Sequence, residues 1–413
     1  MNDPLPLTSI SVQEALEAIL GAFAPLEAVT LPLSDAVGLV LAEDVSSDID
    51  LPPFDNSAMD GYAVQAGDVA GAVPNRPASL RVTGYVPAGA ALGPEDRVEP
   101  GTAFRIMTGA PVPPGADAVV RFEDTSDGRA LDNPGRLPEV RAEPASIGGD
   151  VLIFRGVRAG DNVRLAGEDT RSGTQVLSRG TTIRPAEIGV LAAVGKARVL
   201  AHRRPRVAIM ATGDELVDVT EKPGPGQIRN SNNYAVAAQV TAWGGIAHNL
   251  GVARDDVQDL TAKLRQALDL QPDLVITSAG VSVGDYDIVK DVLRSLGSIS
   301  MWQVRMRPGK PLAFGHIGPN NVPFLGLPGN PVSSMVNMEL FGRPAIMKML
   351  GKSRLQRPII PARALEPLKN DTGREQYIRG IVTRQEGEYV ARTTGGQGSN
   401  LLTSMSKANA LLI

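Results

Sequence analysis

Two stretches of the sequence place acidic side chains directly after short runs of apolar and β-branched residues. In "DLVITSAGVSVGDYD", which begins at Asp273, the run leads to a loop that ends in Asp285 and Asp287. In "RVAIMATGDEL", the acids are Asp214 and Glu215. Neighbouring parallel strands present their carboxyl ends at one edge of a sheet. We therefore expect these four carboxylates to meet and to bind a divalent cation such as Mg²⁺.

The loop before the first pair of acids consists largely of small residues. Backbone N–H groups of such a loop can point into one concavity and bind an anion. A metal ion between the acids and a bound phosphate would offset their repulsion. Capping of a helix N-terminus is the alternative role for Asp214. The residues expected to form the anion site are Ser278, Gly280, Ser282 and Gly284.

A second group of candidate residues is basic. "RMRPGKPLAFG" places Arg305, Arg307 and Lys310 around a Pro-Gly turn, which favours contact with an oxyanion. Solvated surface charge is the alternative. "GLPGNPVSSM" then enters a helix whose first turn carries Ser333. "IMKMLGKS" ends like a Walker nucleotide-binding loop, but it lacks the first glycine and follows a helix, which argues against that loop.

The elements that must position these residues change type along the chain. A capping box at Ser11 and apolar residues on one face predict a helix over 11–23. Short apolar runs cut by Pro and Gly predict β-hairpins and small barrels over 28–185. From 204 onward strands alternate with helices, and short strands return after about 354. The helices expected in the alternating part are 231–243, 256–269, 286–296 and 331–349, and its first strands are 207–211, 248–252 and 274–277.

This pattern predicts a multidomain α/β plus β protein. Its centre is a doubly wound, mostly parallel α/β sheet domain with helices on both faces. β-rich N-terminal domains precede it, and a small, barrel-like C-terminal β domain follows. Ligands of such sheets bind at the carboxyl ends of the strands, where the acids are expected.

Composition limits the chemistry further. The chain has 413 residues, 41 basic and 45 acidic, so no global basic field exists to attract nucleic acid or an anionic membrane. It contains no cysteine and three histidines, which leaves oxygen ligands for any metal. No stretch approaches the roughly 18 apolar residues of a membrane span, and no signal-peptide pattern is present. We therefore expect a soluble cytoplasmic protein.

Several longer strings together resemble a known family. "FDNSAMDGYA", "RIMTGAPVPPGADAVV", "NVRLAGED", "ATGDELV", "SAGVSVGDYD", "RPGKPLAFG" and "GLPGNPVS" occur in the order and spacing of the molybdopterin molybdenumtransferases, the MoeA and gephyrin E-domain family. The resemblance implies insertion of molybdate into adenylylated molybdopterin, Mg²⁺-dependent cleavage of the adenylate and release of AMP. It also implies a homodimer whose active site is shared between protomers.

The resemblance further implies four domains and a set of partners. The domains are a discontinuous N-terminal helix and β linking domain (1–52 and 146–183), a β-rich domain (53–145), the α/β molybdopterin-binding domain (184–343) and a C-terminal β domain (344–413). Molybdopterin adenylyltransferase and downstream cofactor-processing proteins are the implied partners.

Matching positions give the functional residues that the family implies. The implied catalytic positions are Asp60, Thr108, Asp169, Glu215, Asp255 and Asp287. The implied metal ligands are Asp214, Glu215, Asp285 and Asp287. Beside the small-residue loop, substrate or oxyanion contacts are implied for Arg307, Lys310, Pro328, Pro331, Ser333, Arg374 and Ser399.

Three positions depart from the family pattern. Arg307 replaces a usual lysine, Gln303 occupies a position that is often basic, and Asn400 stands where a second serine is frequent. Arginine keeps the charge and can bind an oxyanion through two donors. Two alternative functions are a molybdopterin adenylyltransferase, whose single domain resembles 205–340, and a non-catalytic molybdopterin-binding scaffold.

Overall fold

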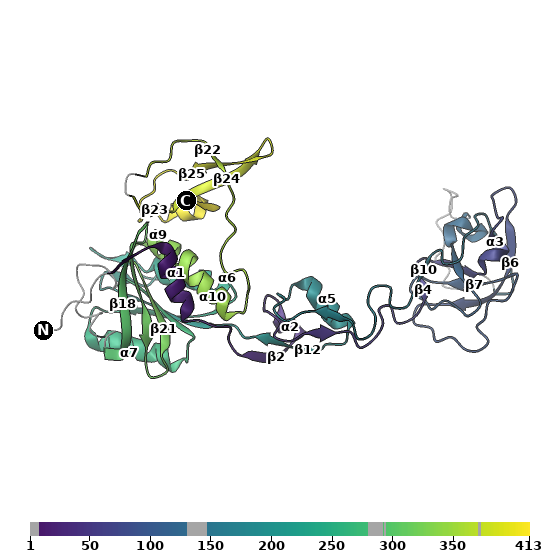
Figure 1. Cartoon of the computed structure of the whole chain (residues 1–413), viewed down its shortest axis with the longest axis horizontal. Coiled ribbons are helices and arrows are strands. Elements are labelled where there is room, and N and C mark those ends of the chain that lie inside the picture. The colour runs from purple at the N-terminus through teal and green to yellow at the C-terminus, as the bar shows by residue number, and fades with distance from the viewer. Residues whose placement is uncertain (1–7, 130–146, 280–291, 293–294, 371–372) are drawn as a thin grey trace. The chain divides into compact units, whose positions relative to one another are not determined.

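The chain divides into two compact units. The computed structural model describes residues 8–129, 147–279, 292, 295–370 and 373–413. The first unit comprises residues 1–43, 179–188 and 198–413, and the second comprises 44–178 and 189–197. Both units are therefore built from segments that are separated in the sequence. Figure 1 shows the chain and labels some of the elements of each unit.

A seven-stranded sheet forms the centre of the first unit (Figure 1). All neighbouring strands run parallel except the two pairs that include β20 (Pro311–Ile317), so the predicted mostly parallel sheet is confirmed. In spatial order the strands are β1 (Thr8–Ile10), β18 (Gly297–Val304), β20, β21 (Val322–Leu327), β17 (Leu274–Ser278), β13 (Arg206–Thr212) and β16 (Ile246–Ala253).

Two helices pack on β13 and β16. α7 (Val257–Asp269) begins at Asp256, whose side chain accepts hydrogen bonds from two backbone N–H groups of the first turn. Its buried residues Leu260, Leu264 and Ala267 lie in one core cluster with Met210 of β13. α6 (Ser231–Ala242) contacts the same two strands. The predicted ranges for both helices are correct to within one residue.

The first unit also contains the N-terminal helix and the helix that follows the "GLPGNP" loop. α1 (Val12–Gly21) has the predicted capping box, in which Ser11 and Glu14 exchange hydrogen bonds. The single helix predicted over 331–349 is wrong in detail. α9 (Pro331–Asn337) passes through a π-helical turn, η3 (Met338–Gly342), into α10 (Arg343–Met349). Pro344 in the middle of the range lacks a backbone donor, which disfavours regular α-helical hydrogen bonding there.

The C-terminal part of the first unit is a small sheet domain, as predicted. Its strand order is β22-β25-β24-β26, and a separate two-stranded ladder joins β19 to β23. The elements are β19 (Met306–Arg307), β22 (Arg363–Ala364), β23 (Glu375–Gln376), β24 (Ile378–Gln385), β25 (Glu388–Thr393), α11 (Thr403–Lys407) and β26 (Ala410–Leu412).

The remaining elements of the first unit are short. Two antiparallel strands, β2 and β12, form one ladder, and the parallel strands β14 and β15 form another. Their bounds are β2 (Ala28–Pro32), α2 (Leu33–Ala36), β12 (Arg198–His202), β14 (Leu216–Val217) and β15 (Ile228–Arg229). α5 (Pro185–Ala193) contains residues of both units.

The second unit is β-rich, as predicted. Its main sheet has the order β8-β5-β7-β6-β9, with apolar clusters formed by alternate residues of the strands. The elements are β3 (Val45–Ser46), β4 (Asn56–Ser57), β5 (Gly61–Val64), α3 (Ala66–Val69), β6 (Ala78–Val86), β7 (Thr102–Ile106), β8 (Ala118–Arg121), η1 (Phe122–Asp124), α4 (Ser126–Arg129), β9 (Asp150–Ile153), β10 (Val163–Arg164) and β11 (Gln175–Leu177).

Within the residues that the structure describes, none of the helices has the length and apolar character needed to cross a bilayer. The predicted helix over 286–296 falls largely outside those residues.

Candidate functional site

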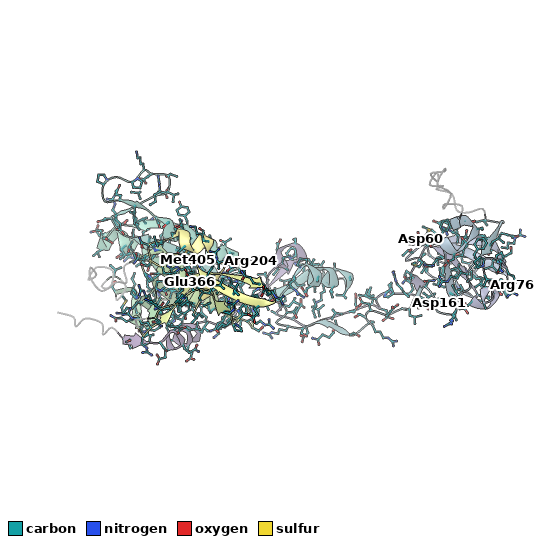
Figure 2. The ribbon with its side chains drawn as sticks, turned by 90° about the horizontal axis from the view of Figure 1, so that it is seen from above. Asp60, Arg76, Asp161, Arg204, Glu366 and Met405 are labelled. Atoms are coloured by element: carbon teal, nitrogen blue, oxygen red, sulfur yellow. The ribbon has the colours of Figure 1, made fainter. Side chains whose placement is uncertain are left out.

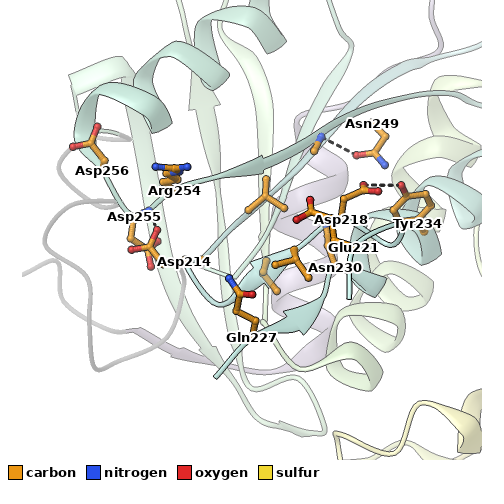
Figure 3. A pocket seen from close by; sticks show the side chains of 15 residues that line it. Asp214, Asp218, Glu221, Gln227, Asn230, Tyr234, Asn249, Arg254, Asp255 and Asp256 are labelled. Carbon is orange, nitrogen blue, oxygen red and sulfur yellow. Dashed lines mark hydrogen bonds between the residues drawn. The ribbon is translucent and has the colours of Figure 1, made fainter. Parts of the chain in front are cut away.

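A polar pocket of about 810 Å³ opens at the carboxyl ends of β13 and β16 (Figure 3). This is the edge at which ligands of parallel sheets bind. Its lining includes five carboxylates and one arginine, so the pocket is strongly acidic. The polar and charged lining residues are Asp214, Asp218, Glu221, Gln227, Asn230, Tyr234, Asn249, Arg254, Asp255 and Asp256.

Two of these acids lie side by side at the strand ends. Oδ1 of Asp214 accepts a hydrogen bond of 3.3 Å from the backbone N–H of Asp255. Gly213 makes this turn with φ +144°, in the region that favours glycine, and its N–H donates to the carbonyl of Ala253 at 3.2 Å. The Glu215 carboxylate folds back beside Gly213, and Glu215 does not line the pocket. Strand-end geometry thus brings Asp214 and Asp255 together, while Glu215 is exposed nearby.

A network of amide side chains forms the opposite part of the pocket. Asn230 caps α6 by accepting from the N–H of Asn233 at 3.2 Å. The buried Asn233 donates to Oδ1 of Asn249 at 3.1 Å and to the carbonyl of Gly251 at 2.9 Å. Sequence reasoning missed this network, because the contact between α6 and β16 is long-range. The only local signal was the run of asparagines in "RNSNNY", which is typical of a helix N-terminus.

Tyr234 lines the pocket from the first turn of α6. Its hydroxyl donates to Oδ2 of Asp218 at 3.1 Å, as Figure 3 shows. Oδ1 of Asp218 accepts from the N–H and the hydroxyl of Thr220 at 3.0 and 2.8 Å. These bonds from Thr220 lower the pKa of Asp218, and the bond to Asp218 raises the pKa of Tyr234.

Two buried hydroxyls lie at the end of β17. Thr277 and Ser278 are 2% and 1% exposed, and neither hydroxyl has a hydrogen-bond partner among the described residues. Buried polar groups normally have such partners, so these two hydroxyls are candidates for ligand contact. The rest of the predicted anion site and two of the predicted metal ligands, Gly280, Ser282, Gly284, Asp285 and Asp287, lie outside the described residues.

The predicted oxyanion residues belong to elements that meet around α9. The pairing of β19 with β23 places Arg307 opposite Gln376, directly after Arg374 and Glu375. The turn before Lys310 packs on α9, since Asn337 donates to the carbonyl of Gly309 at 3.2 Å. A Cβ at Gly309, where φ is +97°, would lie 2.5 Å from Oδ1 of Asn337, so this approach requires glycine.

The loop that carries Ser399 reaches the start of α9. The N–H of Val332 donates to the carbonyl of Ser399 at 3.1 Å, beside the buried Ser333. The loop from Gly326 to Asn330 is fixed from α6, because Asn232 donates to the carbonyl of Gly329 at 2.7 Å. In this loop, the predicted contact Pro328 precedes α9, and Pro331 is its first residue.

Arg379 supports the Ser399 loop from inside the C-terminal domain. This residue is 1% exposed, and its guanidinium donates to the hydroxyl of Ser404 and to the carbonyl of Gly398, both at 3.1 Å. Burial lowers the pKa of this arginine. The side chain of Gln397 bonds both the N–H and the carbonyl of Arg379. Sequence reasoning missed this residue, since nothing local distinguishes it from a surface arginine.

In the second unit, Asp60 and Thr108 form a pair. Oδ1 of Asp60 accepts from the N–H and from the hydroxyl of Thr108, each at 2.7 Å. These bonds, with a smaller contribution from Arg105, lower the pKa of Asp60. Arg105 stacks on the rings of Phe122 and Tyr62 at 4.1 and 5.2 Å. Figure 2 labels Asp60 at the surface of this unit, where it is exposed.

Asp169 lies elsewhere in the second unit. It lines a shallow hollow together with Pro52, Arg164 and Glu168. The Asp169 N–H donates to the carbonyl of Leu51 at 3.0 Å, which fixes its backbone.

The described residues contain no group of three or more His, Cys, Asp or Glu side chains arranged to bind a metal ion. What the described part of the pocket offers is the pair of carboxylates on Asp214 and Asp255. Mg²⁺ in proteins is often held by one or two carboxylates, with the remaining positions taken by water and substrate phosphates. The carboxylate pair fits that coordination.

Comparison with known families gives three consecutive matches. The MoeA N-terminal region (domain I and II) matches residues 10–195, the probable molybdopterin binding domain matches 208–348, and the MoeA C-terminal region (domain IV) matches 361–413.

Individual proteins are similar over nearly the whole chain. Molybdopterin molybdenumtransferase 1 of Mycobacterium tuberculosis is 35% identical over 98% of this chain and 94% of its own length. Molybdopterin molybdenumtransferase of Nostoc sp. is 39% identical over 92% of this chain and 83% of its own length. The crystal structure of the molybdopterin biosynthesis moeA protein from Pyrococcus horikoshii OT3 aligns with a TM-score of 0.74 and 28% identity, covering 98% of this chain and 94% of that one.

Proposed function

Because this chain belongs to the MoeA family of molybdopterin molybdenumtransferases, we propose that it inserts molybdenum into adenylylated molybdopterin and releases AMP. One observation of the structure carries the proposal. A strongly acidic pocket lies at the carboxyl ends of parallel strands, and two buried hydroxyls at the neighbouring strand end lack a partner among the described residues. An anionic substrate would bind there together with a cation.

Asp214 and Asp255 are the proposed Mg²⁺ ligands within the described pocket, and Glu215, Asp285 and Asp287 remain predicted contributors. Bound Mg²⁺ would screen the phosphate charge and polarise the phosphoanhydride. Thr277 and Ser278 are consecutive residues of β17, so their side chains point to opposite faces of the sheet, and the hydroxyl of one of them would donate a hydrogen bond to a phosphate oxygen. Removal of water from this buried donor would strengthen the contact.

The basic residues around α9 are the proposed molybdate contacts. Arg307 and Arg374 would bind oxyanion oxygens through paired N–H donors, and Lys310 would add a further positive charge. Ser333 and Ser399 would donate hydrogen bonds from the side of α9. The pairing of β19 with β23 supports this proposal, because it brings the two arginines onto adjacent backbone segments.

We also propose that the protein acts as a homodimer. Asp60, Thr108 and Asp169 of the second unit would then act on substrate bound by the first unit of the partner subunit. The family resemblance supports this proposal, and C2 dimers are the commonest oligomers of soluble proteins.

The proposal is tested by AMP release from adenylylated molybdopterin with Mg²⁺, with and without molybdate. We expect molybdate-dependent AMP release and molybdenum bound to the pterin. Asp255→Asn should lower the rate by about tenfold or more, because it removes one carboxylate of the acidic pair. Asp269→Asn, which removes an exposed acid at the end of α7, is the matched control and should leave the rate unchanged.

Other outcomes point to the two alternatives. ATP consumption in the presence of molybdopterin would favour an adenylyltransferase. Binding of the adenylate without AMP release under either condition would favour a scaffold. Full activity of Asp255→Asn would contradict the assignment of this acid.

A further inference from the structure

Among the residues that the structure describes in the lining of the acidic pocket, Tyr234 is the one aromatic residue. The chain has only 16 aromatic residues: eight Phe, six Tyr and two Trp. Tyr234 is 44% exposed, and Figure 3 shows its ring at the pocket wall. An aromatic ring left open in a polar pocket offers a flat apolar surface that a planar ligand can cover.

The orientation of this ring is fixed from two sides. Tyr234 lies in the first turn of α6, which Asn230 caps, and the neighbouring Asn233 is completely buried. At the other end of the ring, the hydroxyl donates to Asp218 at 3.1 Å, and Asp218 is itself held by Thr220. A ring held in this way loses little conformational entropy when a ligand stacks on it.

The polar groups near the ring define the kind of ligand. Asp218 and Glu221 present carboxylate acceptors on the same wall, and Asn230 and Asn249 add amide groups that accept and donate hydrogen bonds. Carboxylates accept from amino groups and ring N–H groups. The combination of a flat ring with such acceptors therefore suits a planar nitrogen heterocycle that carries an amino group.

We propose that Tyr234 is a substrate-binding residue whose ring stacks on an amino-substituted heterocycle of the substrate. This inference rests on the proposed function, because adenylylated molybdopterin carries two such rings, adenine and pterin. Both rings are planar nitrogen heterocycles that carry an amino group. The titration below distinguishes adenine from pterin.

The alternative is a purely structural role, in which the hydroxyl of Tyr234 only stabilises the segment that carries Asp218. The two roles depend on different parts of the side chain. Stacking needs the ring and not the hydroxyl, whereas the structural role needs the hydroxyl and its bond to Asp218. Tyr234→Phe and Tyr234→Trp keep a ring, Tyr234→Leu removes it, and Asp218→Asn weakens the bond without touching the ring.

The test is calorimetric titration of the full chain with AMP and, separately, with 6-hydroxymethylpterin, each up to millimolar concentration. We expect one of the two probes to bind Tyr234→Phe and Tyr234→Trp within about threefold of the unmodified chain. The same probe should bind Tyr234→Leu about tenfold or more weakly, as expected when a stacking ring is lost. The probe that responds identifies the stacked ring. Tyr389→Leu, at a tyrosine of similar exposure on β25, is the matched control.

Three results would overturn the proposal. The first is equal binding of both probes by Tyr234→Leu and the unmodified chain. The second is an equal loss in Tyr234→Phe, Tyr234→Leu and Asp218→Asn, which would show a purely structural role. The third is no binding of either probe to the unmodified chain. Because the titration requires neither molybdate nor turnover, its result is independent of whether AMP release is observed.

Discussion

At the scale of single residues, the pair formed by Asp60 and Thr108 shows how local hydrogen bonds set the charge of a candidate catalytic group. Two donors of Thr108 converge on one carboxylate oxygen, which stabilises the ionised form of Asp60 and lowers its pKa. Because the pKa of Asp60 is lower in the folded state, its ionisation stabilises the fold at pH values above the pKa that Asp60 has in the unfolded chain. This contribution is lost as the pH falls through the folded pKa.

Thr108→Val removes the hydroxyl donor and keeps the backbone donor. We therefore expect the pKa of Asp60 to rise toward its ordinary value, and the stability loss to be larger at neutral pH than in acid. Thr108→Ser keeps the hydroxyl and is the matched control. NMR titration of ¹³C-labelled aspartate carboxyls would measure the shift. An unchanged pKa of Asp60 in Thr108→Val would show that the hydroxyl does not stabilise the carboxylate.

Single residues also show the limit of reading a site from sequence. Asp214 was predicted from its place after a strand, and the structure puts it in the pocket. Asp255 came only from the family motif, because its proximity to Asp214 depends on the pairing of β13 with β16. Tyr234 and Arg379 were missed. Their environments are created by contacts between distant segments, which residue spacing does not reveal.

At the scale of elements, strong local patterns were predicted well and short or irregular elements were not. α7 follows its predicted range because its capping side chain and its apolar spacing agree, and α6 begins directly after its capping residue Asn230. β1 is only three residues long, and β18 was not predicted because "GSISMWQV" has no clear punctuation. Both are stabilised by pairing within the sheet, which is a non-local effect.

The loop of 394–402 is an element whose position depends on one buried arginine. Arg379→Met would remove the hydrogen bonds from the guanidinium to the Gly398 carbonyl and to the Ser404 hydroxyl, which keeps its bond to the Leu401 carbonyl, at a cost of about 0.5–1.5 kcal/mol for each bond lost. We expect faster hydrogen exchange in this loop and a higher KM for molybdate, because Ser399 would lose its position. Arg384→Met, at an exposed arginine on the same strand, should change neither quantity.

Two results would contradict this prediction. An unchanged rate of hydrogen exchange in the loop 394–402 of Arg379→Met would show that the guanidinium does not stabilise this loop. Faster hydrogen exchange in the loop with an unchanged KM for molybdate would show that the loop does not contribute to molybdate binding. Arg379→Lys should give an intermediate effect, since one ammonium group cannot reproduce the two-sided contact of the guanidinium.

At the scale of the whole molecule, the candidate residues are divided between two units that are each compact. The acidic pocket and the basic residues around α9 belong to the first unit, whereas Asp60, Thr108 and Asp169 belong to the second. The proposed homodimer gives this division a function, because one site would be completed by residues from both protomers. Each protomer would then contribute to both sites of the dimer.

Co-expression of two variants that each have a strongly lowered rate of AMP release tests this arrangement directly. A dimer with shared sites has two of them. In a dimer formed from one Asp60→Ala chain and one Asp255→Asn chain, one site would contain neither substitution and the other would contain both. Random pairing makes half of the dimers mixed, so about a quarter of the sites should be active. Different affinity tags on the two chains would isolate the mixed dimer, in which about half of the normal AMP release is expected. Each variant expressed alone should release AMP at about a tenth of the normal rate or less. If the isolated mixed dimer shows no recovery, each site must be formed within one chain, since both chains would then carry a defect in their own site.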